Sequence, residues 1–435
     1  MPVTTPIHER LSDLRREFHQ YPEPAWREFY TTSRLAEEIE YIGVDQLHLG
    51  REAMNPAERL AVPSATEIDR WREQAREDGA PAEFLDRLED CTGAVAVLEH
   101  GDGPTVALRV DIDGLLREES PDETHHPAAE GFRSRHDGIM HACGHDAHMT
   151  IGLGILEAIA ESDFSGTFKV FFQPAEEKAG GARPMAKSEH IVDVDYLFAT
   201  HVGLDHPTGE IVSGMVKPLA VSNLSVTFRG KSAHAGLAPN EGQNAMQALG
   251  TAIQNAYAIP RHVDGTTRVN IGRVEGGTAQ NVIAERIEAE AEVRGETTHL
   301  MEYTKTKFEN TAHAAAAMHE CEVDVTVDGQ APRADSDPEL AAIVGESARN
   351  HHDVDHVIDS IRFGASEDAT YLMDAVQKQG GLATYVIVGT DHPTGHHTAT
   401  FDIDEASLPI AVDVLTDAIC TVAHRDPLPS SEEDS

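Results

Sequence analysis

The chain has 435 residues, of which 40% are hydrophobic, so it is long enough for two folded domains with buried cores. Its 34 basic and 75 acidic residues give a net charge of −41, which repels nucleic acid and anionic membranes and excludes both as partners. The chain has neither a signal-peptide pattern nor an apolar run of about 18 residues, which predicts a soluble, cytoplasmic protein.

Among the basic residues, lysine is scarce: the chain has eight lysines and 26 arginines. An acid-rich, lysine-poor surface resembles that of proteins adapted to molar salt, where screening limits charge repulsion to about 3 Å. We therefore expect a halophilic protein, with an ordinary acidic protein as the alternative.

The first block, residues 1–212, alternates apolar runs with a helical pattern over 148–161. This alternation predicts an α/β sheet covered by helices on both faces. Within the block, the polar, proline-broken residues 51–90 predict a helical insertion. The expected buried parallel strands are 93–100, 105–110, 167–172 and 195–200.

The second block, residues 213–331, has the order β-α-β-β-α-β, which predicts a ferredoxin-like α+β module inserted into the first domain. Its expected strands are 222–230, 267–274, 286–295 and 321–327, and its expected helices are 244–259 and 300–319.

The third block, residues 332–424, returns to α/β with one strand at 383–389 and helices at 338–351, 365–377 and near 405–419. It is too small to cover a parallel strand on both faces. We therefore expect 1–212 and 332–424 to form one discontinuous domain. The tail, 425–435, is predicted to be disordered.

Polar side chains follow four of the predicted strands at the point where each strand ends. They are Asp111 and Asp113, then Gln173, Glu176 and Glu177, then His201, and finally His396 and His397. Open α/β sheets place their sites beyond the carboxyl ends of the strands, so these groups are expected to share one site.

The stretch HACGHDAH, 141–148, is a candidate metal site. Cys143 and His145 are two residues apart, so in an extended chain both side chains leave the same side of the backbone. A thiolate with an imidazole suits zinc or manganese better than magnesium or calcium. A chance cluster is the alternative, since the chain has 25 histidines. We expect only positioning or helix-start roles for His141, Asp146 and His148.

The two adjacent carboxylates in QPAEE cannot easily contact the same atom, which predicts a different role for each. Glu177 is expected to bind metal, and Glu176 to take a proton from a metal-activated water and deliver it to a leaving amine. A solvated surface pair is the alternative. Asp111 is expected to orient an imidazole or to cap a turn.

Five candidate ligands exceed the capacity of one tetrahedral ion, which predicts two metals that share the Cys143 thiolate. The ligands are Cys143, His145, Glu177, His201 and His397.

The second block adds two neutral hydrogen-bonding groups in small-residue turns, His234 in SAHAG and Asn281 in GGTAQNVI. They suit a substrate carbonyl or a developing oxyanion. Arg294 is expected either to hold a substrate carboxylate or to pair with a surface acid. The absence of GxSxG, GxxxxGK[ST] and GxGxxG after a strand excludes the usual serine-hydrolase, P-loop and dinucleotide sites.

These motifs, in this order and spacing, resemble the amidohydrolase branch of the M20-type metallopeptidases over nearly the whole chain. The resemblance implies two divalent ions, manganese or alternatively zinc, the five ligands named above, and Glu176 as general base. It also implies that 213–331 is a dimerisation and lid domain. From this domain His234 reaches the site of a partner, which is either a second copy or a homologous subunit, with Asn281 and Arg294 nearby.

Within the branch, LGREAMNPAERLAVPS (49–64), the insertion after it and GTDHPTGHHTATFDIDE resemble members that hydrolyse p-aminobenzoyl-glutamate. The expected activity is hydrolysis of that amide or of a related N-acyl amino acid. The alternatives are a general N-acyl-amino-acid amidohydrolase and a non-catalytic subunit, although an inactive subunit needs no Glu176. Where peptidase members have His-x-Asp, this chain has Arg109-Val110-Asp111, so Cys143 with His145 must compensate.

Overall fold

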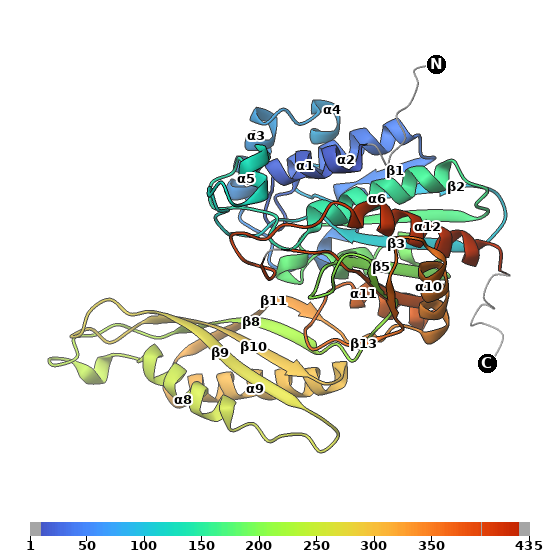
Figure 1. Ribbon diagram of the computed structural model, residues 1–435. Helices are drawn as coiled ribbons and strands as arrows, with labels where there is room; N and C mark the ends of the chain where they lie inside the picture. Colours follow the sequence, from blue (N-terminus) through green and yellow to red (C-terminus); the bar gives the residue numbers. More distant parts are fainter. Residues whose placement is uncertain (1–9, 393, 426–435) are drawn as a thin grey trace. The chain divides into compact units, whose positions relative to one another are not determined.

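The computed structural model describes residues 10–392 and 394–425, which divide into two compact units (Figure 1). Unit 1 comprises Met1–Val216, Ala334–Arg362 and Asp368–Ser435, and unit 2 comprises Lys217–Arg333 and Phe363–Glu367. Apart from Arg425, the predicted tail lies outside the described residues. The assignment of catalytic and dimerisation roles to particular domain limits stays a prediction.

Unit 1 contains an eight-stranded sheet whose centre is parallel, as predicted. Strands β4, β3, β5 and β14 run parallel, and β12 is parallel to β6. In spatial order the strands are β1 (Gln46–Leu49), β2 (Ala94–Glu99), β4 (Thr167–Gln173), β3 (Thr105–Asp111), β5 (Tyr196–Val202), β14 (Leu382–Val388), β6 (Glu210–Val212) and β12 (His356–Ile358).

The prediction that 93–100 forms a parallel strand is wrong, because β2 is antiparallel to β4. Only a short turn separates β2 from β3 in the chain, and a parallel return needs a crossover of a dozen or more residues. The chain therefore reverses direction between β2 and β3, and β4 lies between them parallel to β3.

Helices cover both faces of this sheet (Figure 1). One layer joins α1 (Leu11–Gln20), α2 (Phe29–Ile42), α6 (His145–Ala160), α10 (Pro338–Asn350) and α12 (Ser407–Ala423), and the other joins α7 (Ala182–Ala186) and α11 (Thr370–Lys378). The central helix α6 is buried along most of its length, and Gly154 lets it approach α12, since a Cβ there would lie 2.6 Å from a methyl carbon of Val412. Close packing of α6 fixes the helix that begins with His145.

Residues 51–90 contain the short helices η2 (Gly50–Glu52), η3 (Pro56–Glu58), α3 (Ala65–Glu77) and α4 (Ala82–Leu85), and α3 and α4 pack on α2. The remaining elements of unit 1 are α5 (His126–Glu130), η4 (Glu176–Lys178), η5 (Glu189–Ile191), and the paired strands β7 (Met215–Val216) and β13 (Ile361–Arg362).

The helix expected over 365–377 begins at Thr370 instead. Its first predicted residues belong to unit 2, where the N–H of Leu219 donates to the carbonyl of Ala365 and the Ser366 hydroxyl donates to that of Leu219. These bonds hold the segment extended and prevent an earlier helix start.

Unit 2 confirms the β-α-β-β-α-β order. All pairs in its sheet are antiparallel, in the order β11, β8, β10, β9. Helices α8 and α9 contact the buried face of the sheet. The elements are β8 (Ala220–Arg229), η6 (Pro239–Glu241), α8 (Ala245–Tyr257), β9 (Thr267–Gly276), β10 (Arg286–Gly295), α9 (Thr298–Met318) and β11 (Glu322–Ala331). Within the described part of the chain, no helix has the length and apolar character needed to cross a bilayer.

Candidate metal centre

The turn into α6 positions Cys143 and His145. Gly144 separates them with φ +85°, and a Cβ at this position would lie 2.5 Å from a methyl carbon of Val202. Only glycine satisfies both conditions without strain. Both flanking side chains are buried. The cysteine and the histidine are therefore held beside the end of β5.

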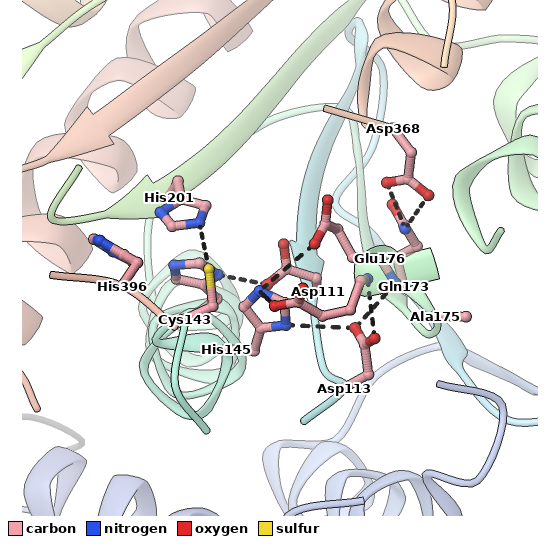
Figure 2. A network of polar contacts seen from close by, with 12 residues as sticks. Asp111, Asp113, Cys143, His145, Gln173, Ala175, Glu176, His201, Asp368 and His396 are labelled. Carbon is pink, nitrogen blue, oxygen red and sulfur yellow. Dashed lines mark hydrogen bonds and ion pairs between the residues drawn. The ribbon is translucent and has the colours of Figure 1, made fainter. Parts of the chain in front are cut away.

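His201, at the end of β5, presents one nitrogen to Cys143 (Figure 2). Its Nδ1 donates to the carbonyl of Val202 at 2.7 Å, so the hydrogen of the neutral ring is on Nδ1. The unprotonated Nε2 then lies 3.5 Å from the Cys143 sulfur. An imidazole oriented by a hydrogen bond at one nitrogen and open at the other is ready to bind metal.

The QPAEE turn is held from two sides. The Asp113 carboxylate accepts the N–H groups of Glu176 and Glu177 at 3.0 and 3.1 Å, and Glu28 accepts that of Ala175 at 2.8 Å. Ala175 has φ +55°, a left-handed conformation that these bonds stabilise. The backbone that carries the two adjacent carboxylates is therefore held beside His145, whose Nε2 lies 3.9 Å from Glu176 and 3.8 Å from Glu177.

Sequence reasoning did not assign roles to Asp113 and Glu28. The sequence contains a clue to Asp113, which lies two residues after Asp111 and so on the same side of an extended chain. In the structure its carboxylate lies 3.4 Å from Nδ1 of His145. Glu28 has no such clue, since it is far from QPAEE in the chain. Burial, together with the nearby Asp113 charge, raises the pKa of Glu28 to about 8.

His397 completes the cluster from the loop after β14. Its N–H donates to the carbonyl of Ala142 at 2.7 Å, which ties this loop to the residue before Cys143. Its Nε2 lies 3.6 Å from Glu177 Oε1, and its side chain is 55% exposed. One edge of the cluster is therefore open to solvent, whereas Cys143, His145 and His201 are buried.

These distances fit bound metal. Ions with bonds of about 2.0–2.3 Å to nitrogen, oxygen and sulfur hold neighbouring ligand atoms about 3.3–3.8 Å apart in a tetrahedral arrangement. Overlapping groups have ligand atoms within 4.8 Å of one another, among them Cys143 with His145 and His201, Cys143 with Glu177 and His397, His145 with Glu176 and Glu177, and Asp111 with His145 and His148. Neither ring nitrogen of the buried His145 has a hydrogen bond within the usual geometric limits, although carboxylate oxygens lie 3.4 Å from Nδ1 and 3.6 Å from Nε2. Thiolate, imidazole and carboxylate together suit a borderline transition ion.

His148, near the same cluster, is not available as a ligand. Its Nε2 accepts the N–H of Val202 at 2.8 Å, so its hydrogen is on Nδ1, which donates to Asp111 at 2.5 Å. Burial would raise the pKa of Asp111, but His145, His148 and Arg109 hold it well below its usual range. Asp111 is therefore an ionised carboxylate whose Oδ1 lies 3.6 Å from His145 Nε2, and it orients the imidazoles.

A sequence profile of peptidase family M20/M25/M40 matches residues 107–421, which include every ligand candidate. The chain belongs to this family. It is 39% identical over 410 residues to indole-3-acetyl-aspartic acid hydrolase of Enterobacter agglomerans, with 93% of this chain and 94% of that protein covered. It is 38% identical over 411 residues to a p-aminobenzoyl-glutamate hydrolase subunit of Escherichia coli K12, with the same shares covered.

A solved structure has the same architecture. The aminobenzoyl-glutamate utilization protein from Klebsiella pneumoniae superposes with a TM-score of 0.83 at 32% identity, covering 97% of this chain and 98% of that one. The M20 membership expected from the motifs is confirmed.

Arg109, two residues before Asp111 on β3, links three buried groups. Its guanidinium contacts Asp111 at 2.9 Å, Gln173 at 2.7 Å and Asp368 at 3.1 Å. Gln173 in turn donates to Asp368 at 2.9 Å (Figure 2). A buried cation therefore occupies this position of β3, and Cys143 and His145 remain the ligand candidates on that side.

A second buried network lies behind α6. Asp146, the residue after His145, forms an ion pair with Arg15 at 2.7 Å and accepts from His19 Nδ1 at 2.8 Å. The other nitrogen of His19 bonds to Glu119 at 3.0 Å. Burial and the Arg15 charge lower the pKa of His19, but these carboxylates outweigh them and raise it to about 9. Burial raises the pKa of Glu119, but hydrogen bonds from His125 and His19 lower it to about 2. Asp146 thus anchors the ligand helix to α1.

Unit 2 brings the predicted His234 and Asn281 onto neighbouring segments, since the Ala235 N–H donates to the carbonyl of Asn281 at 2.9 Å. Nδ1 of the exposed His234 accepts the N–H groups of Gly236 and Leu237 at 3.1 and 3.2 Å. The hydrogen of the neutral ring is therefore on Nε2, where it can be donated to an oxyanion. The roles of both residues stay predictions.

Arg294 has an acidic partner on its own strand. Its Nε and Nη2 donate to the two oxygens of Glu292 at 3.1 and 3.0 Å. Of the two roles considered for this residue, ion pairing is the one present in this structure, and carboxylate binding would require Glu292 to be displaced.

Proposed function

We propose that this M20 chain hydrolyses the amide bond of p-aminobenzoyl-glutamate or a related N-acyl amino acid. The observation that carries the proposal is the Glu176 carboxylate, which lies beside the ligand candidates, 3.9 Å from His145, on a backbone whose N–H is held by Asp113. A carboxylate held next to metal ligands can move a proton between a water molecule and a leaving amine.

Divalent ions at this cluster would polarise the scissile carbonyl and lower the pKa of a water molecule towards about 7. Glu177, with Cys143, His145, His201 and His397, would hold the two ions. The donor set suits zinc or manganese better than calcium or magnesium, and manganese is proposed first because of the family resemblance.

The chain's own carboxylate then carries the proton. Glu176 accepts a proton from the attacking water and later gives it to the amine of the departing amino acid, so that the amide C–N bond breaks and an acid and a free amino acid form. The turn that holds Glu176 limits its movement during this transfer.

The substrate class follows from what two relatives share. One is named for an indole-3-acetyl aspartate and the other for a p-aminobenzoyl glutamate, so the acyl group differs and the acidic amino acid is common to both. We propose an N-acyl derivative of an acidic amino acid as substrate, with p-aminobenzoyl-glutamate first. A general N-acyl-amino-acid amidohydrolase is the second candidate.

The active assembly is proposed to be a dimer with a second copy or a homologous subunit, in which His234 of unit 2 completes the partner's site. The p-aminobenzoyl-glutamate relative is itself named as one subunit of a hydrolase. Mixing a His234→Ala chain with a Glu176→Ala chain should restore activity if His234 acts across the dimer, and mixed dimers with no restored activity would contradict it.

The substrate is tested with a panel of amides, with manganese or zinc added. The assay is run in molar KCl, because the acidic, lysine-poor composition favours a cytoplasmic halophilic protein. The panel compares p-aminobenzoyl-glutamate, indole-3-acetyl-aspartate, hippurate and acetyl amino acids. The proposal predicts the highest kcat/KM for the first two. Higher values for hippurate or acetyl amino acids would support the general amidohydrolase instead.

A further inference from the structure

The segment 114–120, which follows Asp113, is tied to both chain segments that carry ligands at the open side of the site. Leu115 forms an antiparallel bridge with Met140, three residues before Cys143, and the two residues exchange backbone bonds of 2.9 and 3.1 Å. Farther along, the N–H of Ser120 donates to the carbonyl of Ala399, two residues after His397, at 2.8 Å. Residues 116–119 therefore lie between anchors on each side of the metal centre.

The two acidic residues of this segment are engaged by basic groups. Glu118 forms an ion pair with Arg133 at 2.6 Å. Glu119 is buried, and its carboxylate bonds to His19 and His125. The backbone is thus fixed on both sides of residues 116 and 117, which remain exposed, Leu116 at 73%.

Two exposed arginines of this region, Arg117 and Arg135, form no ion pair with the described residues, and Arg135 contacts the Tyr21 hydroxyl. Within the described part of the chain the Arg117 guanidinium has no ion pair, although the sequence contains 75 acidic residues. By contrast, Arg109 is buried against Asp111, and Arg133 is paired with Glu118. The bond from the Ser120 N–H to the Ala399 carbonyl places the exposed segment that carries Arg117 beside the loop of His397, whose side chain is 55% exposed.

An exposed guanidinium such as that of Arg117 can attract and orient a substrate carboxylate. An N-acyl acidic amino acid carries two carboxylates, and it approaches a chain of net charge −41. A guanidinium binds a carboxylate through two parallel N–H···O bonds, which gives both attraction and orientation. A neutral aromatic acyl group offers no such contact.

We propose that Arg117 binds a carboxylate of the amino acid part of the substrate at the solvent-open edge of the metal centre. This inference rests on the proposed function, and it assigns the preference for an acidic amino acid to a residue of unit 1. Arg117 orients the substrate so that its amide carbonyl reaches the cluster and Glu176, and it takes no part in proton transfer.

The test uses the metal-loaded full chain and its Arg117→Gln and Arg117→Lys variants. Loss of a charge-assisted, two-bond contact should raise KM for p-aminobenzoyl-glutamate by roughly 10- to 100-fold with little change in kcat or in metal content. Arg117→Lys, which keeps the charge, should recover part of the loss. The matched control is Arg70→Gln, which removes an exposed arginine of α3 that also forms no ion pair with the described residues, and it should change nothing.

Two further substrates identify the carboxylate. Each of these substrates lacks the charge of one carboxylate: p-aminobenzoyl-glutamine lacks that of the side chain, and the α-amide of p-aminobenzoyl-glutamate lacks that of the α-carboxylate. When the missing charge is the one that Arg117 contacts, wild type and Arg117→Gln should have the same KM. Calorimetric binding of uncleaved p-aminobenzoyl-glutamate to Glu176→Gln, with and without Arg117→Gln, should show the same loss of affinity without catalysis.

The outcomes separate the inference from the proposed function. If the wild-type chain cleaves p-aminobenzoyl-glutamate and Arg117→Gln has the same KM and binding constant, the inference is wrong and the function stands. An equal loss on all three substrates, or in Arg70→Gln, also overturns it. If the wild-type chain cleaves none of them, the proposed function fails and the inference fails with it.

Discussion

Replacing His19 by Gln should remove a pH-dependent part of the stability of unit 1. Both ring nitrogens contact carboxylates, Nδ1 at 2.8 Å from Asp146 and Nε2 at 3.0 Å from Glu119. A carboxylate only accepts hydrogen bonds, so both nitrogens carry hydrogen and the buried ring is an imidazolium. Glutamine cannot supply this charge.

The magnitude follows from the pKa of His19, about 9 in the folded chain against 6.5 for an unperturbed histidine. At about 1.4 kcal/mol per unit, the difference corresponds to about 3 kcal/mol. Because the folded pKa is raised, this stabilisation is fully present below pH 6.5 and is lost as the pH rises through about 9.

The assay is urea unfolding followed by tryptophan fluorescence at constant salt, at several pH values from about 6 to about 9.5. Both tryptophans, Trp26 and Trp71, are buried in unit 1, so the signal reports the unit that contains His19. The difference in unfolding free energy between wild type and His19→Gln cancels other groups that titrate in this range, such as Glu28. This difference in unfolding free energy should shrink by up to about 3 kcal/mol as the pH rises across this range. A difference that stays constant, or that grows with pH, would refute a protonated His19.

Two further substitutions test how the ligands are held. Asp113→Asn replaces a carboxylate that orients both His145 and the QPAEE backbone, and it should weaken metal binding by about 10- to 100-fold in equilibrium dialysis; an unchanged affinity would contradict that role. Gly181→Ala should abolish metal binding, since its Cβ would overlap the Pro174 carbonyl oxygen. Gly250→Ala, in α8 with open space around it, should instead raise the melting temperature, and a lower one would be unexpected.

The sheet and the cluster of ligand candidates could be predicted from the sequence because both leave local signals. Buried parallel strands appear as apolar runs, and the polar residue that directly follows such a run marks the carboxyl edge of the sheet. His201 and Glu177 were found in this way, and the structure brings both to the same cluster. The direction of 93–100 was wrong, since direction depends on the connection to the next strand and not on the residues of the run.

The residues that hold the ligands could not be predicted, because their partners are far away in the chain. Asp146 pairs with Arg15, and Glu28, the residue before α2, accepts the N–H of Ala175. Neither pair has a spacing or periodicity that marks it, and each is recognisable only once the fold places the two groups side by side. Arg117 belongs to the same class, since only the folded chain distinguishes an unpaired surface arginine from a paired one.

The central claim is that Glu176 moves protons while Glu177, its neighbour, holds metal. The most direct measurement compares Glu176→Gln with Glu177→Gln, after loading with manganese, by metal content per chain and by release of p-aminobenzoate from p-aminobenzoyl-glutamate. The account predicts that Glu176→Gln keeps the metal content of the wild type and loses at least about 100-fold in kcat, whereas Glu177→Gln loses metal. Loss of metal in Glu176→Gln, or full activity without this carboxylate, would contradict it.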